Sequence, residues 1–511
     1  MHCVYHLAPP LGYSNGARRG EPYTLTAFEE PLGERRQGAS IYLAALLLAQ
    51  VCALTRYVLL ARLLGPQQLG LAATLVLTAQ FFDSFTDAGS DRFLIQDEEG
   101  DTPKVQKMVQ GVFIVRGIAT AAALALFSVP IAHFFKTPSL APAIVVLALY
   151  PLTNGLMHLD NRRRQRAHDF RPEGITILCS EAASIIVTAI VAWITRSYTA
   201  VLWAMMTRAI VIVLVSHLLS KRKYELGYAP DVAGRLARFA APLMVNGLIL
   251  FFGGQGDRLI VVNQLGLTEL GRYSAVILLI FYPATVFMQY GSALYLPKIA
   301  ASRGNVEQRR RLADAMAGQT LIAAIGMSAG FALVAPTAVL LLYGSKFTQT
   351  AFIVALIGIL QTSRFIRVWP TTMALGLGKS GIVLGNNVAR LVGFPVALGA
   401  VALGGGLEGL VCGFISGEII ALVTGVVMVN LAAHENMLRD LERIAAFLLG
   451  SGAVLAWVVV AARPSIAGLT AVAAGSLIWI WWVLGRESAT IDAAIQWAAE
   501  LRGRWFARQP S

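Results

Sequence analysis

Long apolar runs recur along the chain, and this feature constrains the fold more than any other. From Gly38 to Gly485, runs of about 20 residues follow one another with few charges inside them. A helix needs about 20 apolar residues to cross a hydrocarbon core of about 30 Å. The pattern therefore predicts an all-α polytopic membrane protein with about 14 transmembrane helices. The expected spans are 39–62, 68–90, 108–132, 139–159, 173–194, 199–219, 237–262, 270–294, 313–337, 347–370, 380–402, 405–431, 443–462 and 466–485.

The composition excludes the main soluble classes of protein. Only 14% of the 511 residues are charged and 56% are hydrophobic, whereas a soluble domain is about 25% charged. A soluble, disordered or coiled-coil chain, or a nucleic-acid-binding domain, is excluded for the chain as a whole. The cysteines form no CxxC pair, and three lie in apolar runs, which favours buried packing over disulfides or structural zinc. They are Cys3, Cys52, Cys179 and Cys412.

The distribution of Lys and Arg predicts the orientation. With the amino terminus in the cytoplasm, 29 of the 42 basic residues fall in cytoplasmic segments and six on the other side. The net charge of +13 is therefore mostly a topology signal, and both termini are expected in the cytoplasm. The outward loops are too short for a catalytic domain, and the motifs GxxxxGK[ST] and HExxH are absent. We expect neither an enzyme nor a bound cofactor or metal.

An internal repeat suggests how the helices are grouped. The motif LG-x3-LG occurs at 64–70 and again at 265–271, each time in the outward turn after an odd-numbered helix. Helices 1–6 would then repeat as helices 7–12 around an axis along the membrane normal, with two helices added; a common turn arising twice is the alternative. The expected organisation is a flexible cytoplasmic tail (1–38), an N-lobe (39–219), a cytoplasmic linker (220–236), a C-lobe (237–431), helices 13–14 (443–485) and a cytoplasmic tail (486–511) that is either an interfacial amphipathic helix or frayed.

Charged residues inside the expected spans are the candidate functional residues. An Arg at the centre of a membrane helix costs about 2.5–3.5 kcal/mol on insertion scales, so we expect these residues to face a central cleft or to pair with acids. The excess of arginines predicts an anionic substrate, and their planar forks suit a diphosphate. The candidate substrate-binding residues are Arg208, Arg390, Arg364, Arg258, Arg56, Arg116 and Arg367. The candidates for ion coupling, salt bridges or a gate are Asp257, Glu181, Glu418, Asp83 and Asp87.

Simpler roles remain open for several of these residues. Arg56 and Arg258 could snorkel to the outer surface, and Arg367 could simply end a span at the cytoplasm. Asp83 and Asp87 could cap the inner end of the second helix. The repeat also aligns Arg56 with Asp257, which suggests a gate between the lobes.

Three stretches resemble the Wzx-type polysaccharide flippases of the multidrug/oligosaccharidyl-lipid/polysaccharide exporter superfamily. The first holds Arg62–Gly65, Gly70, Asp87 with Gly89, and Ile95 with Gln96. The second is RRRQRAHDF before the fifth helix, and the third is GDRLIVVNQLGLTELGRYSAV, with Gly271 and Tyr273. The resemblance spans roughly residues 38–440 and implies two six-helix lobes, two extra helices and alternating access.

The resemblance also implies a substrate and a location. The substrate would be an oligosaccharide on undecaprenyl diphosphate, moved from the cytoplasmic to the periplasmic leaflet of the bacterial inner membrane during exopolysaccharide, capsule or O-antigen synthesis. Membrane lipids would surround a monomer, and a polysaccharide polymerase and chain-length or export proteins are candidate partners. Two other hypotheses are a cation-coupled drug antiporter of the same superfamily and a membrane enzyme acting on lipid-linked glycans.

Overall fold

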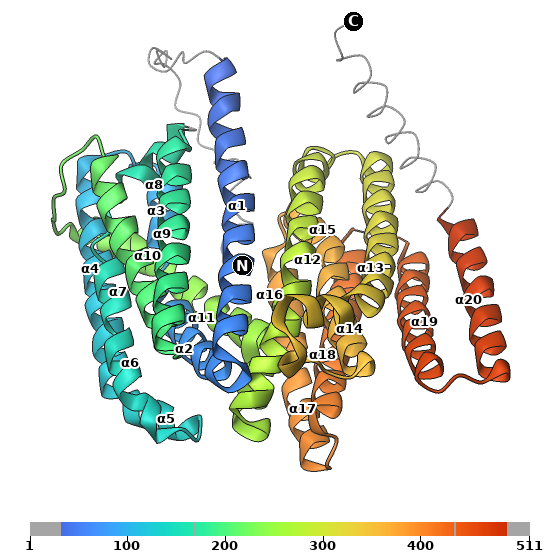
Figure 1. Cartoon of the computed structure of the whole chain (residues 1–511). Coiled ribbons are helices and arrows are strands. Elements are labelled where there is room, and N and C mark those ends of the chain that lie inside the picture. The colour runs from blue at the N-terminus through green and yellow to red at the C-terminus, as the bar shows by residue number, and fades with distance from the viewer. Residues whose placement is uncertain (1–31, 168, 434–435, 488–511) are drawn as a thin grey trace, which may run out of the picture. The chain divides into compact units, whose positions relative to one another are not determined.

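The chain forms a bundle of long apolar helices. The computed structural model describes residues 32–167, 169–433 and 436–487 (Figure 1). Within these residues it contains thirteen helices long and apolar enough to cross a membrane, and no strand. A shorter apolar segment, Pro138–Asn154, takes the place of the predicted span 139–159. The predicted polytopic all-α fold is confirmed, with one span replaced by short helices.

The first half of the chain follows the predicted spans closely. Its helices are α1 (Leu32–Leu64), α2 (Pro66–Thr86), α3 (Ser90–Gln96), α4 (Pro103–Leu126), α5 (Ser128–Phe134), η1 (Pro138–Leu140), α6 (Ala141–Leu147), α7 (Leu149–Asn154), α8 (Asp160–Arg164), η2 (Gln165–Ala167), α9 (Arg171–Thr195), α10 (Thr199–Leu218), α11 (Pro230–Ile260) and the π-helical η3 (Val261–Leu265). Helix α1 begins at Leu32, inside the segment 1–38 that was predicted as a tail.

The second half is equally regular. Its helices are α12 (Leu267–Ala301), α13 (Val306–Tyr343), η4 (Ser345–Phe347), α14 (Ala351–Ile366), α15 (Val368–Gly376), α16 (Ser380–Arg390), α17 (Gly393–Ala402), α18 (Gly406–Ala433), α19 (Met437–Ala462) and α20 (Ile466–Arg486). The predicted cytoplasmic tail lies almost wholly outside the described residues, which end at Glu487.

Prolines explain where several predicted spans divide. A proline has no N–H to donate to the carbonyl four residues earlier, and its ring clashes with that carbonyl. Helix α14 ends at Ile366, four residues before Pro370, and α16 ends at Arg390, five residues before Pro395. The breaks after Leu126 and Leu147 precede Pro130 and Pro151 by four residues in the same way.

The described chain divides into two compact units. The N-unit holds the residues up to Ala275 together with Leu342–Phe347. The C-unit holds Val276–Leu341 and the residues from Thr348 onward. Helix α11 and the start of α12 therefore pack with the N-terminal helices, so the predicted linker 220–236 does not separate the two compact units.

Two of the three described cysteines are not buried. Cys179 on α9 and Cys412 on α18 are exposed, and Cys52 is half-buried. The prediction of buried packing is therefore wrong for Cys179 and Cys412. In a membrane-spanning helix, an apolar side chain gains as little by facing another helix as by facing lipid, so burial is not required.

Candidate functional site

Four charged side chains meet in the middle of the C-unit, and we call Arg364, Arg367, Arg390 and Glu418 the C-unit charge cluster. Arg390 Nε lies 2.6 Å from Glu418 Oε1, and Arg364 Nε lies 3.1 Å from the same oxygen. Arg367 Nη1 lies 2.7 Å from Glu418 Oε2. The glutamate side chain is 1% exposed and the three arginines are 5–12% exposed. One buried carboxylate therefore holds three guanidinium groups.

The helix breaks place these side chains. Arg367 is the residue between α14 and α15, and Arg390 is the last residue of α16, so both lie where a proline interrupts a predicted span. Gly417 lets α18 approach this region closely, because a Cβ there would lie 2.7 Å from the carbonyl oxygen of Arg390. Glu418, the next residue, thereby reaches the two interrupted helices.

The C-unit charge cluster carries an excess of two positive charges. Its neighbours on the same helices are uncharged, and Asn387 Oδ1 accepts a 3.4 Å hydrogen bond from Arg367. Among the described residues, Arg367 Nε, Gln361 Nε2 and Asn386 Oδ1 are buried without a hydrogen-bond partner. Buried polar atoms without a hydrogen-bond partner are unfavourable, so a ligand that supplies partners would be stabilised here. The cluster is therefore suited to an anion with about two charges and several acceptor oxygens.

A second set of predicted residues meets in the N-unit, and we call Arg56, Glu181 and Arg208 the N-unit charge cluster. Arg56 Nη1 donates to Glu181 Oε2 at 2.7 Å and to Ser184 Oγ at 3.1 Å. Arg208 Nε lies 2.9 Å from Glu181 Oε1, at an angle that makes no hydrogen bond. The glutamate is 5% exposed, whereas Arg208 is 41% exposed and so presents its charge at the surface of the unit.

Arg116 lies among the acids at the end of α2. It donates to the backbone carbonyl of Asp83 at 3.1 Å, and its guanidinium lies 3.7 Å from the carboxylate of Asp83 and 3.9 Å from that of Asp87. Asp87 accepts the amide of Gly89 at 3.0 Å, and Gly89 has a φ of 58°. The Asp-x-Gly motif therefore shapes the turn that ends α2, in addition to balancing Arg116.

The remaining candidates, Asp257 and Arg258, each bind an uncharged side chain. Asp257 is fully buried and accepts the Tyr273 hydroxyl at 2.8 Å, which links α11 to α12. Arg258 donates to Gln255 at 2.8 Å on its own helix. Tyr273 was missed as a partner, although the Gly-x-Tyr motif singles it out in the sequence.

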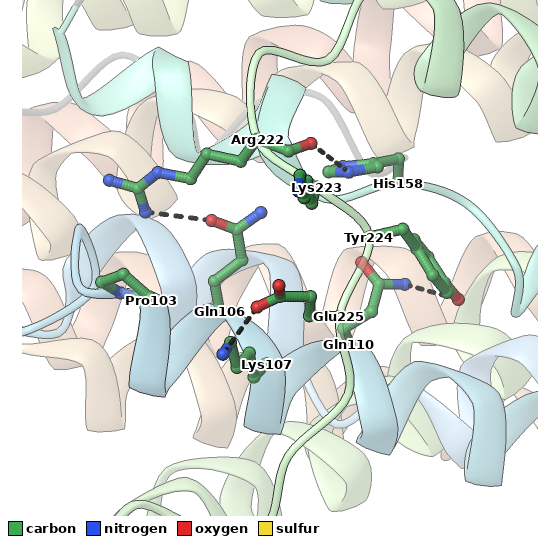
Figure 2. Close-up of a pocket in the computed structure, with 9 residues that line it drawn as sticks. All are labelled: Pro103, Gln106, Lys107, Gln110, His158, Arg222, Lys223, Tyr224 and Glu225. Atoms are coloured by element: carbon green, nitrogen blue, oxygen red, sulfur yellow. Dashed lines mark hydrogen bonds and ion pairs between the residues drawn. The ribbon is translucent and has the colours of Figure 1, made fainter.

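A pocket of about 260 Å³ lies beside the segment that joins α10 to α11 (Figure 2). Its side chains bind one another: Lys107 Nζ lies 2.6 Å from Glu225, Arg222 donates to Gln106 at 3.0 Å, and Gln110 donates to the Tyr224 hydroxyl at 3.2 Å. The pocket residues fasten this segment to the start of α4. Its lining residues are Pro103, Gln106, Lys107, Gln110, His158, Arg222, Lys223, Tyr224 and Glu225.

A buried aspartate fastens the same segment. Asp160 accepts the Lys221 amide at 2.8 Å and the Arg163 Nε at 2.7 Å. Burial alone would raise the pKa of Asp160, but these two donors lower it below its ordinary value. Burial and the neighbouring His217 lower the pKa of His158, whose ring accepts the Asp160 amide at 3.1 Å. The sequence identified this segment only as a basic linker.

Arg443 forms another network that the sequence did not identify. Its guanidinium contacts Glu487 at 2.8 Å, Asp314 at 3.0 Å and Asp440 at 3.1 Å, and so joins α13 and α19 to the residue that follows α20. Among the described residues, no group of three His, Cys, Asp or Glu side chains could hold a metal ion.

Comparison with known proteins identifies a matching family and a relative. The model of a family described as "Polysaccharide biosynthesis protein" matches residues 59–352, more than half of the chain. The succinoglycan biosynthesis transport protein ExoT of Rhizobium meliloti (strain 1021) is 23% identical over 355 residues, which are 68% of this chain and 69% of that protein.

Solved structures of membrane transporters share the fold. The lipid II flippase MurJ in an inward closed conformation gives a TM-score of 0.63 at 15% identity, over 88% of this chain and 99% of that one. A multidrug resistance MATE family transporter of the MOP superfamily, in an inward-facing conformation, gives 0.57 at 13% identity, over 76% of this chain and 94% of that one. The fold is that of MOP-type transporters.

Proposed function

Because this chain belongs to the polysaccharide biosynthesis protein family, we propose that it is a flippase for an undecaprenyl-diphosphate-linked oligosaccharide. It would move this lipid from the cytoplasmic to the periplasmic leaflet of a bacterial inner membrane, with both termini in the cytoplasm. The observation that carries the proposal is the C-unit charge cluster, where Arg364, Arg367 and Arg390 share one carboxylate inside an apolar helical bundle.

The excess charge of the cluster matches the chemistry of a diphosphate. Glu418 carries one negative charge and contacts three guanidinium groups, so these four side chains sum to a charge of +2, which a ligand with two negative charges would match. A guanidinium donates two parallel hydrogen bonds to phosphate oxygens, and each charge-assisted bond contributes about 1.5–3 kcal/mol. The polyprenyl tail would remain in lipid while the head group enters the protein, and alternating access would release it on the other side.

The N-unit charge cluster is a separate candidate position for an anionic group. Arg208 is the most exposed arginine of the two clusters, and Glu181 holds both it and Arg56 in place. We propose that Arg208 makes contact early, when the lipid first enters. The acids would then act as resident counter-ions that keep the arginines ordered in the absence of substrate.

Flipping in proteoliposomes tests the function and the site together. The probe is a fluorescent undecaprenyl-diphosphate disaccharide whose inner-leaflet fraction is protected from a membrane-impermeant quencher. The double variant Arg367→Ala/Arg390→Ala leaves Glu418 with Arg364 alone, so we expect flipping to fall by roughly 10–100-fold. Arg390→Lys, which keeps the charge and loses the fork, should give an intermediate rate.

The control is Arg311→Ala, because the Arg311 side chain is 79% exposed and its ion pair among the described residues is with Glu307 on its own helix. This variant should flip the probe as the unmodified protein does. Flipping at the unmodified rate by the double variant would overturn the site. Export of a cationic dye by the unmodified protein, with no flipping of the diphosphate probe, would support the drug antiporter and overturn the proposed function.

A further inference from the structure

The two copies of the LG-x3-LG motif lie against each other. Gly70, in the fifth position of α2, faces Leu267, the first residue of α12: a Cβ on Gly70 would lie 2.7 Å from the Leu267 carbonyl carbon and closer still to its oxygen. Gly271, in the fifth position of α12, faces Pro66, the first residue of α2, with the matching distance 2.8 Å. The contact is thus reciprocal, and each motif supplies one glycine and one carbonyl.

The backbone of the two turns is also repeated. Gly65 before α2 has φ 78° and ψ 172°, and Gly266 before α12 has φ 90° and ψ 176°. A residue with a side chain rarely adopts this positive φ, so the first glycine of each motif allows the turn. The second glycine leaves the space that the partner helix fills. All of these residues lie in the N-unit.

Two arginines beside the motifs bind the turn that follows α13. Arg62 Nε donates to the Leu342 carbonyl at 2.6 Å, and Arg272 Nε donates to the Lys346 carbonyl at 3.1 Å. This turn, Leu342–Phe347, belongs to the N-unit although the helices on both sides of it belong to the C-unit. Close glycine contacts and guanidinium bonds therefore meet at one end of the bundle, the end predicted to face outward.

We propose that the paired LG-x3-LG motifs are a latch between α2 and α12 that is closed in this structure and separates when the outward end opens for release of cargo. The proposal rests on the proposed function for its role in transport. Whether the two turns dock and separate can be tested without any transport assay. The two helices pack backbone against backbone, with no side chains between them. Such close-packed contacts do not deform continuously, so we expect two states, docked and undocked.

Spin labels placed beside the latch test the docking directly. Gln67 and Thr268 occupy equivalent positions in the two motifs and are exposed, so each can carry a label after substitution by Cys in a background without native cysteines. The unmodified latch should give a short, narrow distance distribution. Gly70→Ala with Gly271→Ala should shift the ratio of docked to undocked molecules by roughly tenfold toward longer distances, because each Cβ would overlap a carbonyl.

The matched control is Gly254→Ala, since a Cβ on this α11 glycine has no atom within 4 Å. Its distance distribution should be that of the unmodified protein. An unchanged distribution in the double alanine variant would overturn the latch. The outcome does not depend on any substrate, so it can stand if the proposed function fails.

Reversible cross-linking covers the case in which the alanine variants do not fold. Gln67→Cys/Thr268→Cys in the cysteine-free background, joined by a short thiol-reactive cross-linker that a reductant cleaves, should lose flipping of the diphosphate probe and regain it after reduction. Each single cysteine treated in the same way should stay active. Full flipping by the cross-linked protein would overturn the role of the latch, whatever the labels report.

Discussion

At the scale of single residues, the two glutamates that the sequence placed in mid-span organise the two charge clusters. Glu181 binds Arg56 and Arg208, and Glu418 binds all three C-unit arginines. The sequence predicted that buried arginines would face a central cleft or pair with acids, because an isolated charge in the membrane is costly. It could not say which acid takes which arginine, since the paired residues lie 27 to 125 positions apart in the sequence.

Removing the carboxylate charge of Glu418 should destabilise the protein strongly. Glu418→Gln leaves three guanidinium groups buried together, and breaking a buried pair in this way costs about 3–5 kcal/mol. Glu181→Gln should cost less, because Arg208 is 41% exposed and keeps part of its hydration. The measurement is the midpoint of thermal unfolding in detergent, where a smaller loss for Glu418→Gln than for Glu181→Gln would contradict the argument.

The Asp160 contacts make the segment after α10 sensitive to acid. The pKa of Asp160 is lowered in the folded protein, so its stabilising effect is present above the ordinary value of 3.8 and is lost as pH falls through the lower folded value. Asp160→Asn should therefore cost roughly 1–3 kcal/mol at pH 7, through its weakened bonds to Lys221 and Arg163.

Hydrogen exchange of the amides at 219–224 checks this prediction. The difference between the unmodified protein and Asp160→Asn should be large at pH 7, should begin to shrink as pH falls through 3.8, and should vanish only below the lower pKa of the folded protein, where the aspartate is protonated there as well. A difference in exchange that does not change with pH would mean that the negative charge of Asp160 does not stabilise the segment. Asp231→Asn is the control, because the Asp231 side chain is 51% exposed and its partners among the described residues, Lys104 and Arg235, are 56% and 36% exposed.

At the scale of helices, the predicted boundaries agree with the structure where hydropathy ends abruptly and differ where proline intervenes. The predicted span 380–402 is two helices, because Pro395 and Gly393 interrupt it beside Arg390. Hydropathy averages over such a break, since the residues on both sides are apolar. Other prolines, such as Pro283 and Pro336, remain inside continuous helices, so the residue type alone did not identify which positions break.

The break at Pro370 should be required for the position of Arg367. Pro370→Ala restores an N–H that can donate to Ile366, so we expect α14 to continue into α15. Arg367 would then rotate away from Glu418, and flipping of the diphosphate probe should fall by about tenfold or more while the protein stays folded. Pro336→Ala, at a proline inside the continuous helix α13, should leave flipping unchanged. Unmodified flipping by Pro370→Ala would show that the break does not position the arginine.

At the scale of the whole molecule, the repeat was visible in the sequence as two seven-residue motifs 201 positions apart. The structure adds that the two motifs contact each other, which follows from a parallel repeat whose equivalent turns lie near its symmetry axis. The division into an N-unit and a C-unit could not be predicted, because it depends on packing across residues 220–275 rather than on hydropathy.

Membrane potential should drive the proposed transport in one direction. In the proposed orientation, with both termini in the cytoplasm, the proposed diphosphate cargo would carry two negative charges outward across an inside-negative membrane. Each charge contributes about 2.3 kcal/mol per 100 mV of membrane potential. Two charges therefore contribute roughly 4–5 kcal/mol per 100 mV if no other charge crosses. Proteoliposomes with a potassium diffusion potential should flip the diphosphate probe faster toward the positive side, and reversing the potential should reverse the preference. Equal rates at both polarities would mean that a cation crosses with the diphosphate, and the five acids in the spans would then be the place to look for its site.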